Sequence, residues 1–296
     1  MEAVTDVVFR HVVRHAATPD MYFTEFTNAT GWAAAGDKAI GTRLAKTDDE
    51  HPIVAQLWGA DPVAMAKLAQ HCKVLGYDGI DLNMGCPDAS AVKGGGGAGM
   101  IRTPELASDM IAAAKTSDLP VSVKTRLGYS KPDEWHEWLG HLLRQDIANL
   151  TIHLRTKKEM SKVPAHFELI DDIKKLRDEI APQTLLTING DIRDRQHGLE
   201  LIEKHGVDGV MIGRGIFHNP FAFEMSPKTH SREELLGLLH LQLDLHDEYE
   251  KLSPRKFDPL KRFFKIYVRE FDGAAELRDK LMHTKSTDEV RALIGA

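Results

Sequence analysis

The stretch PIVAQLWGADPVAMAKLAQHCKVLGYDGIDLNMGCP, residues 52–87, contains two short apolar runs, at 52–59 and 79–85, with an amphipathic segment between them. The composition and length of the two runs predict β-strands. The segment between them begins with Asp61 as N-cap and Pro62 at the first helical position, which predicts a helix. A strand, a helix and a second strand in this order indicate a parallel pair joined by a right-handed crossover.

The same alternation continues on both sides of this unit. Helical spacing recurs at 103–115 and 164–180, and further strand-like runs occupy 21–26, 120–128, 149–155, 184–190 and 209–215. The predicted fold class is α/β, a TIM (β/α)8 barrel, for which a doubly wound open sheet is the alternative. A barrel needs eight strands and seven are visible, because the chain opens with a turn and a helix at 1–16. We therefore expect the first strand to be missing or truncated, with its sequence upstream of Met1.

The pattern changes after residue 223, where Leu-rich helical segments replace the alternation. We predict two domains, a barrel at 1–223 and a small all-α domain at 224–296. Within the second, the segment 251–269 carries seven Lys or Arg residues and one acidic residue, with Phe263, Phe264 and Tyr267 interleaved. This segment either tracks an RNA backbone or forms a solvated helix face over an aromatic core.

The overall composition excludes several classes of protein. The content of 42% hydrophobic residues predicts a globular protein. No apolar run approaches 18 residues, so no membrane span is expected. Two cysteines in dissimilar surroundings fit a reducing cytoplasm. The net charge of −6 does not suggest a nucleic-acid binder, although a local patch could bind one. No metal site is expected, because HEWLGH (136–141) spaces its histidines by five residues. No exposed apolar stripe stands out, and a monomer is slightly favoured.

Polar residues collect at the predicted carboxyl ends of the strands, where barrels of this type place their active sites. They are Gln56, Asn83, Cys86, Lys124, Arg126, His153, Arg155, Asn189, Asp191 and Arg214. The last two strands end in the glycine turns NGDI (189–192) and GRG (213–215), which predict a phosphorylated cofactor. Lys124 is either a solvated rim residue or a cation that stabilises charge on a reduced ring, and His153 is either a core histidine or a ligand contact.

Six motifs in order resemble those of the dihydrouridine synthase family, flavin enzymes that reduce uridines in RNA. They are MEAVTD (1–6), DLNMGCP (81–87), VKTRLG (123–128), TIHLRT (151–156), NGDI (189–192) and GVMIGRG (209–215) followed by Asn219 and Pro220. The resemblance spans almost the whole chain. It implies a barrel with a helical RNA-binding domain, FMN as the cofactor and NADPH as its reductant. The flavin-contacting positions it implies are Met1, Gln56, Lys124, His153, Asn189, Gly190, Asp191, Gly213 and Arg214.

The same resemblance makes Cys86 the general acid and places Asn83 near the target base. Lys93, Arg126 and Arg155 are further predicted substrate contacts. Saturating the C5–C6 bond of uracil requires a hydride and a proton, so a thiol that donates the proton agrees with the chemistry. Gly94 to Gly97 then form the hinge of a mobile loop that carries Cys86 over the base.

The chain departs from the family in three features: the missing first strand, the run of four glycines and the segment HLRTKKEMSKVPAHFE (153–168). The last of these lines the substrate side and bears on the target nucleotide. The expected substrate is tRNA, and rRNA is an alternative. A small-molecule FMN oxidoreductase of the dihydroorotate dehydrogenase type and a non-catalytic RNA-binding protein are the other hypotheses.

Overall fold

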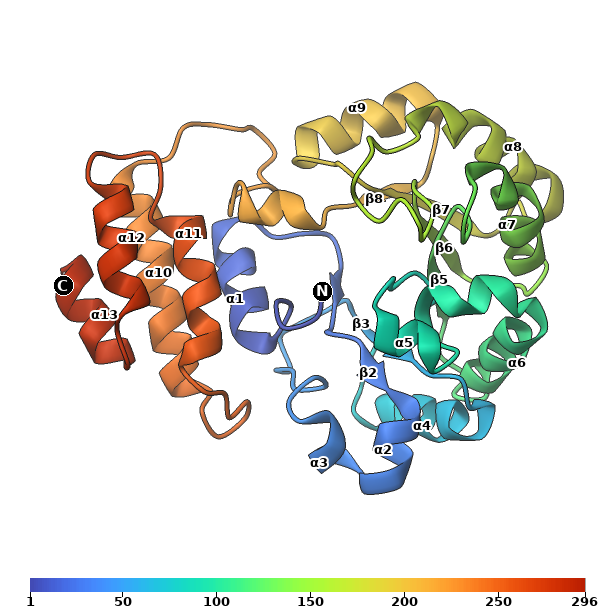
Figure 1. Ribbon diagram of the computed structural model, residues 1–296, viewed down its shortest axis with the longest axis horizontal. Coiled ribbons are helices and arrows are strands. Elements are labelled where there is room, and N and C mark those ends of the chain that lie inside the picture. Colours follow the sequence, from blue (N-terminus) through green and yellow to red (C-terminus); the bar gives the residue numbers. More distant parts are fainter. Residues whose placement is uncertain (296) are drawn as a thin grey trace.

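The computed structural model describes residues 1–295, and its central feature is a curved parallel sheet beside a group of helices (Figure 1). The order of the strands in the sheet is their order in the chain. They are β1 (Tyr22–Phe23), β3 (Ile53–Trp58), β4 (Gly79–Asn83), β5 (Val121–Arg126), β6 (Asn149–His153), β7 (Leu185–Asn189) and β8 (Gly209–Met211), with β2 (Thr27–Asn28) also paired to β3. All pairs are parallel.

This strand order confirms the barrel-type prediction. A doubly wound sheet would reverse its strand order at a switch point, and no reversal occurs among the described strands, so that alternative is wrong. Within residues 1–295 no strand joins β8 to β1, and the sheet is a curled half-barrel open on that side. The strand expected upstream of Met1 stays a prediction.

The predicted strand at 21–26 is divided into β1 and β2, both of which pair with β3. Thr24 lies between them, and its hydroxyl accepts the backbone N–H of Gln56 at 3.0 Å. A side chain thus takes the place of a backbone acceptor in the ladder, and the strand is interrupted there.

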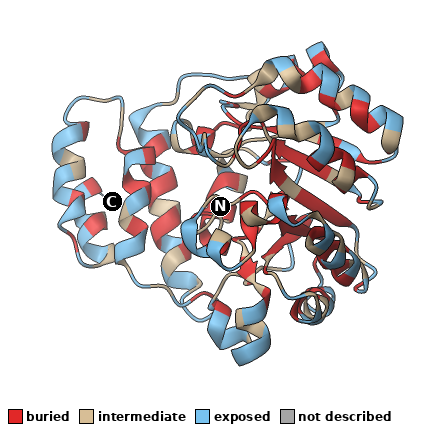
Figure 2. Ribbon diagram, turned by 45° about the vertical axis from the view of Figure 1, so that its right-hand side comes forward, coloured by how far each residue is buried: buried red, intermediate tan, exposed pale blue. Residues whose placement is uncertain are grey.

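The outer face of the sheet is apolar and covered by helices. Leu150 and Ile188 are fully buried in a core that also contains residues of the covering helices, and Figure 2 shows burial along the strands. These helices follow the strands in turn as α4 (Pro62–Val74), α6 (Pro104–Lys115), α7 (Trp135–Leu143), α8 (Ile170–Ile180) and α9 (Arg195–His205). Asp61 caps α4 through the N–H groups of Val63 and Ala64, as predicted.

A second apolar core joins the first helix of the chain to the last ones. Helix α1 (Val7–Ala16) packs with α10 (Arg232–Glu248), and Figure 1 shows α1 beside the C-terminal helices. The remaining helices of this part are α11 (Phe264–Tyr267), α12 (Ala274–Met282) and α13 (Thr287–Ile294). The division at residue 223 stays a prediction, and this packing places α1 with the helical part.

The basic segment 251–269 lies over an aromatic core. Phe263, Phe264 and Tyr267 are buried, and the Phe263 ring lies 4.7 Å from that of Phe9 in α1. These rings are therefore not free to stack on RNA bases. Within residues 1–295 no helix has the length and apolar character to cross a membrane.

Candidate functional site

The predicted site residues lie in registered rows across the inner face of the sheet. Lys124 pairs with Asn83 on one side. Two residues closer to the carboxyl end of β5, Arg126 pairs with His153, and His153 pairs with Asn189. Because side chains alternate along a strand, residues paired in this way present their side chains to the same face. The register therefore brings these five residues together at the mouth of the half-barrel.

Lys124 is held inside the mouth by an amide. Its Nζ donates to Asn189 Oδ1 at 3.0 Å, and Asn189 Nδ2 donates to the carbonyl of Met211 at 2.7 Å. Burial, with a smaller effect of the Arg126 charge, lowers the pKa of Lys124 to about 8. Most Lys124 side chains are therefore protonated at pH 7. Lys124 lies inside the mouth and is not a solvated residue of its rim.

His153 is neutral, and its hydrogen bonding fixes the tautomer. Burial, aided by Lys124 and Arg126, lowers the pKa of His153 to about 2. The guanidinium of Arg155 lies 3.0 Å from His153 Nε2 through Nη1. Since a guanidinium can only donate, Nε2 accepts and Nδ1 carries the proton. No protein acceptor within residues 1–295 engages that Nδ1–H, which is therefore available to a ligand.

Asp191 is the carboxylate of this cluster. Its Oδ2 accepts from Arg155 and from the backbone N–H of Ala165 at 3.0 Å, and its Oδ1 lies 3.4 Å from Arg214. Partial burial acts to raise the pKa of Asp191, but these hydrogen bonds and charges outweigh it and hold the pKa below its usual value. Asp191 therefore neutralises part of the charge of the mouth, while the exposed Arg214 side chain stays at its rim.

The two glycine turns lie against each other. A Cβ on Gly215 would come within 2.8 Å of the carbonyl oxygen of Ile192, so only glycine permits this approach. At Gly213 the situation is the opposite, because a Cβ would have no neighbour closer than 3.9 Å, with Asn189 and the Met1 sulfur nearest. The turn is thus less crowded at Gly213 than at Gly215, and it lies beside the Met1 side chain.

Cys86 lies in a turn directly after β4. Asn83 Oδ1 accepts the backbone N–H groups of Gly85 at 3.2 Å and Cys86 at 2.9 Å. Arg126 Nε donates to the carbonyl of Gly85 at 2.7 Å. The thiol is partly exposed, and partial burial is the main cause that raises its pKa. At neutral pH Cys86 is therefore a protonated thiol with access to solvent, whereas burial raises the pKa of Cys72 to about 12.

The glycine run packs tightly behind Cys86. Gly97 has a φ of +53°, and a Cβ there would lie 2.7 Å from the carbonyl oxygen of Cys86. A Cβ on Gly96 would lie 2.9 Å from the Trp58 ring. Close packing therefore accounts for these two glycines, and the predicted hinge stays a prediction. Lys93 is exposed at the end of the short helix α5 (Ala89–Lys93) in the same loop.

Arg126 has a structural role that the sequence did not indicate. Besides Gly85, its guanidinium donates to the carbonyls of Thr156 at 3.1 Å and Met160 at 2.9 Å. Burial is the main cause that lowers the pKa of Arg126 to about 10. Arg126 thus ties the Cys86 turn to the loop after β6, and these bonds occupy both its Nε and its Nη1.

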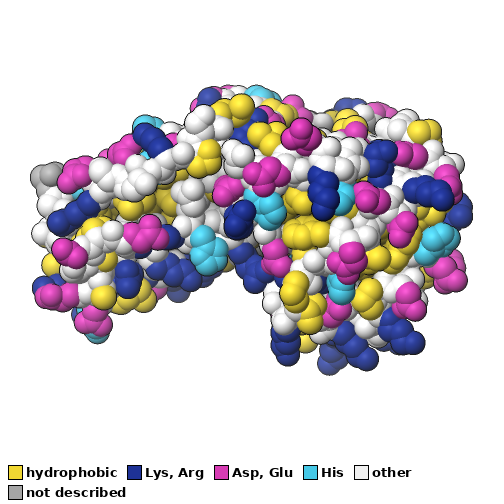
Figure 3. All heavy atoms as spheres, turned by 90° about the horizontal axis from the view of Figure 1, so that it is seen from above, with side chains coloured by type: hydrophobic (Ala, Val, Ile, Leu, Met, Phe, Trp, Pro, Cys, Tyr) yellow, Lys and Arg dark blue, Asp and Glu magenta, His cyan; other side chains and the backbone are white. Residues whose placement is uncertain are grey.

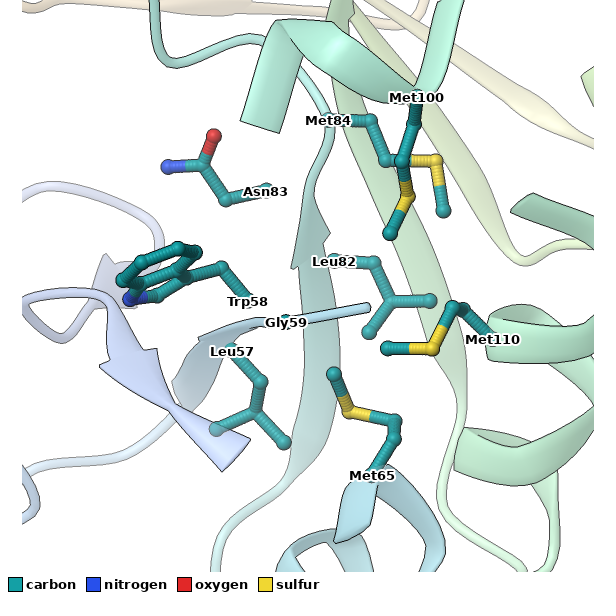
Figure 4. Close-up of a pocket in the computed structure, with 9 residues that line it drawn as sticks. All are labelled: Leu57, Trp58, Gly59, Met65, Leu82, Asn83, Met84, Met100 and Met110. Atoms are coloured by element: carbon teal, nitrogen blue, oxygen red, sulfur yellow. The ribbon is translucent and has the colours of Figure 1, made fainter. Parts of the chain in front are cut away.

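A cluster of methionines supports β4 from the helix side. Figure 4 shows Met84, Met100 and Met110 on one side of β4 and Asn83 on the other. The space among the clustered side chains has no room for a water molecule. This region is therefore packing beneath the site.

Two buried carboxylates were missed by sequence reasoning. Asp81 is fully buried in β4 and accepts from Gln56 Nε2 at 2.7 Å and from Ser122 Oγ at 2.6 Å. Glu25, 1% exposed, accepts from the Ala3 N–H and pairs with Arg255 of the basic segment. In both cases, a charged residue inside an otherwise strand-like run of the sequence could have indicated the buried carboxylate.

The surface shows no single basic region in the view from above. Figure 3 shows two lobes with a notch between them, and on this face Lys and Arg side chains are interspersed with Asp and Glu. In the part of the chain that the structure describes, no group of three or more His, Cys, Asp or Glu residues could hold a metal ion.

Comparison with known proteins identifies relatives over nearly the whole chain. A family model described as "Dihydrouridine synthase (Dus)" matches residues 1–294. The "Probable tRNA-dihydrouridine synthase 2" of Bacillus subtilis (strain 168) is 61% identical over 295 residues, which cover 99% of this chain and 91% of the relative. The "Probable tRNA-dihydrouridine synthase" of Staphylococcus aureus (strain Mu50) is 59% identical, with 99% and 90% covered.

Solved structures share the fold at low sequence identity. The amine oxidase acting on 6-hydroxypseudooxynicotine from Pseudomonas geniculata N1 has a TM-score of 0.55 at 13% identity, covering 75% of this chain and 45% of that one. Histamine dehydrogenase from Rhizobium sp. 4-9 has a TM-score of 0.53 at 11% identity, covering 82% and 47%. At these identities the likeness concerns the fold alone.

Proposed function

The chain belongs to the dihydrouridine synthase family, and we propose that it reduces the C5–C6 double bond of uridines in tRNA, with FMN as cofactor, NADPH as reductant and Cys86 as proton donor. The observation that carries this proposal is a protonated, partly exposed thiol in a turn fixed at the mouth of the half-barrel. The tRNA substrate follows from the names of the relatives, which are 59–61% identical.

The residues at the mouth fit an anionic flavin. The uncrowded turn at Gly213 and the exposed Arg214 suit its phosphate. The Nδ1–H of neutral His153 offers a donor, and Lys124 offers a cation for negative charge on the ring. When bound, FMN supplies the hydride. Met1, Gln56, Asn189, Gly190 and Asp191 complete the proposed flavin contacts.

Cys86 supplies the other half of the reduction. As a hydride is added to one carbon of the C5–C6 bond, the Sγ–H of Cys86 gives its proton to the other, and solvent then reprotonates the thiolate. A raised pKa keeps the thiol protonated before this step. Reaching the base requires its extrusion from the RNA stack. Lys93, Arg155 and Asn83 are the proposed substrate contacts, and Arg126 acts on the substrate side through the backbone that it holds.

The test compares Cys86→Ala with wild type, with Cys72→Ala as the matched control. We expect Cys86→Ala to keep its flavin, measured by visible absorbance, and to lose roughly 10²- to 10⁴-fold in dihydrouridine formation. Cys72→Ala should keep its turnover, because Cys72 is buried in α4. Turnover of Cys86→Ala at the wild-type rate would refute the acid assignment.

The choice of substrate is tested separately, by mass spectrometric mapping of dihydrouridine in tRNA and rRNA with and without the gene. Loss of tRNA dihydrouridine alone supports the proposal, and loss confined to rRNA supports the alternative substrate. A purified wild-type protein that binds no flavin and reduces neither RNA would sink the proposed function.

A further inference from the structure

Inside the half-barrel a buried carboxylate is linked to the backbone of Cys86 through two amide side chains. We propose that Asp81 is a positioning residue, which holds the Cys86 turn in place through Gln56 and Asn83. This inference rests on the proposed function only in giving the turn a catalytic purpose. The links themselves are a property of the fold.

Each link is a hydrogen bond between neighbouring strands or within the turn. Asp81 Oδ2 accepts from Gln56 Nε2 at 2.7 Å, and Gln56 Oε1 accepts from Asn83 Nδ2 at 3.2 Å. Asn83 Oδ1 then accepts the N–H of Cys86 at 2.9 Å. All three side chains are at least nine-tenths buried, so water offers little alternative to these partners.

The direction of every bond is fixed from the Cys86 end. The N–H groups of Gly85 and Cys86 can only donate, so Asn83 must present its oxygen to them. Its NH₂ group then faces Gln56, which must present its oxygen in turn. The NH₂ group of Gln56 is left facing Asp81, where the carboxylate supplies the acceptor. If the oxygen and nitrogen of the Asn83 amide changed places, its NH₂ group would face the N–H groups of Gly85 and Cys86, which are also donors.

Asp81 is also held by a hydrogen bond outside the series that links it to Cys86. Ser122 Oγ donates to Asp81 Oδ1 at 2.6 Å, from the neighbouring strand β5. The carboxylate therefore has a fixed position before Gln56 contacts it. Without an acceptor at residue 81, the buried NH₂ group of Gln56 would lose its partner, and Gln56 and Asn83 would rotate at the expense of the bond to Cys86.

Cysteine labelling makes this link directly observable. The chain has two cysteines, so protein with FMN bound and labelled with ¹⁵N-cysteine gives two backbone amide signals. The Cys86 amide reports the bond to Asn83, and the Cys72 amide, within α4, reports whether the protein remains folded. Hydrogen exchange at both amides and dihydrouridine formation on tRNA are then measured for each variant.

We expect Asp81→Ala to accelerate exchange at Cys86 by about fivefold or more while Cys72 stays protected. Turnover should fall roughly ten- to a hundredfold, because the thiol is no longer held in position. Asp81→Asn should restore both, since its amide oxygen can accept from Gln56 while its NH₂ group faces the Ser122 hydroxyl. Gln56→Leu interrupts the same chain and should accelerate Cys86 exchange even if Asp81→Ala does not fold.

Thr151→Val is the matched control, because Thr151 is a fully buried polar residue of the half-barrel outside the chain of links. It should leave Cys86 exchange unchanged. Unchanged Cys86 exchange in folded Asp81→Ala, equal acceleration by Asp81→Asn, or equal acceleration by Thr151→Val would each overturn the proposal. If the amide results hold but wild type forms no dihydrouridine, the proposed function fails and the positioning role of Asp81 stands.

Discussion

The two faces of the same sheet have opposite chemistry. On the outer face, Leu150 and Ile188 are fully buried among apolar side chains of the covering helices. On the inner face, the ionisable residues Asp81 and Arg126 are buried and Lys124 is partly buried, and burial raises the pKa of Asp81 and lowers that of Lys124. Adjacent residues of one strand therefore serve packing or the site, according to the side to which they point.

Hydrogen bonding explains how the half-barrel holds these ionisable side chains in its interior. An unpaired buried polar group is costly, and the inner residues avoid that cost by bonding to one another and to the backbone. Lys124 bonds to Asn189, Asp81 to Gln56 and Ser122, and Arg126 to carbonyls. The inner face is thus organised by directional bonds, and the outer face by apolar burial.

Leu150→Ala should give the largest change on the outer face. Removing most of a fully buried side chain should lower the free energy of unfolding by about 2–5 kcal/mol. Turnover per folded molecule should stay near wild type, because the residue points away from the mouth. Urea unfolding and dihydrouridine formation, scaled to folded protein, measure the two effects. A large loss of turnover per folded molecule would show that this outer-face residue also serves the site.

Lys124→Met tests the inner face through pH. The pKa of Lys124 falls from 10.5 to about 8 in the fold, so between these values the unfolded chain binds the proton more tightly. The contribution of Lys124 to the free energy of unfolding therefore rises with pH across that window.

In Lys124→Met this rise should disappear, which urea unfolding of both proteins from pH 7 to 10 would measure. Lys204→Met, at an exposed lysine near the end of α9, should keep the wild-type slope. Equal slopes for wild type and Lys124→Met would mean that burial does not shift this lysine.

Local pattern was enough to predict the architecture and most of the mouth. Strands show in the sequence as short apolar runs, and polar residues at their carboxyl ends indicated Lys124, His153 and Asn189 before their register was known. Parallel register then brought these residues together without further information. Such sites can be predicted from sequence because the local sequence preferences agree with the fold.

Interactions between distant segments could not be predicted in this way. Glu25 and Arg255 are 230 positions apart, and their pairing depends on how the helical part docks. The series of hydrogen bonds from Asp81 to Cys86 depends on which atom of each side-chain amide faces which neighbour. The sequence does not directly encode these side-chain orientations. Likewise, the sequence left open whether Phe263 and Phe264 were exposed or buried, and only packing against α1 decides it.

Arg214→Ala should give the smallest change in stability among these variants, while it should weaken cofactor binding. The Arg214 side chain is 59% exposed and lies 3.4 Å from Asp191, so its removal should change the free energy of unfolding by less than about 0.5 kcal/mol. Flavin affinity should nevertheless fall roughly tenfold, because a charged donor at the proposed phosphate position is lost. Fluorescence titration with FMN, beside thermal unfolding of the same samples, separates the two quantities. Unchanged flavin affinity would exclude Arg214 from the phosphate site and would leave the glycine turns and His153 to hold the cofactor.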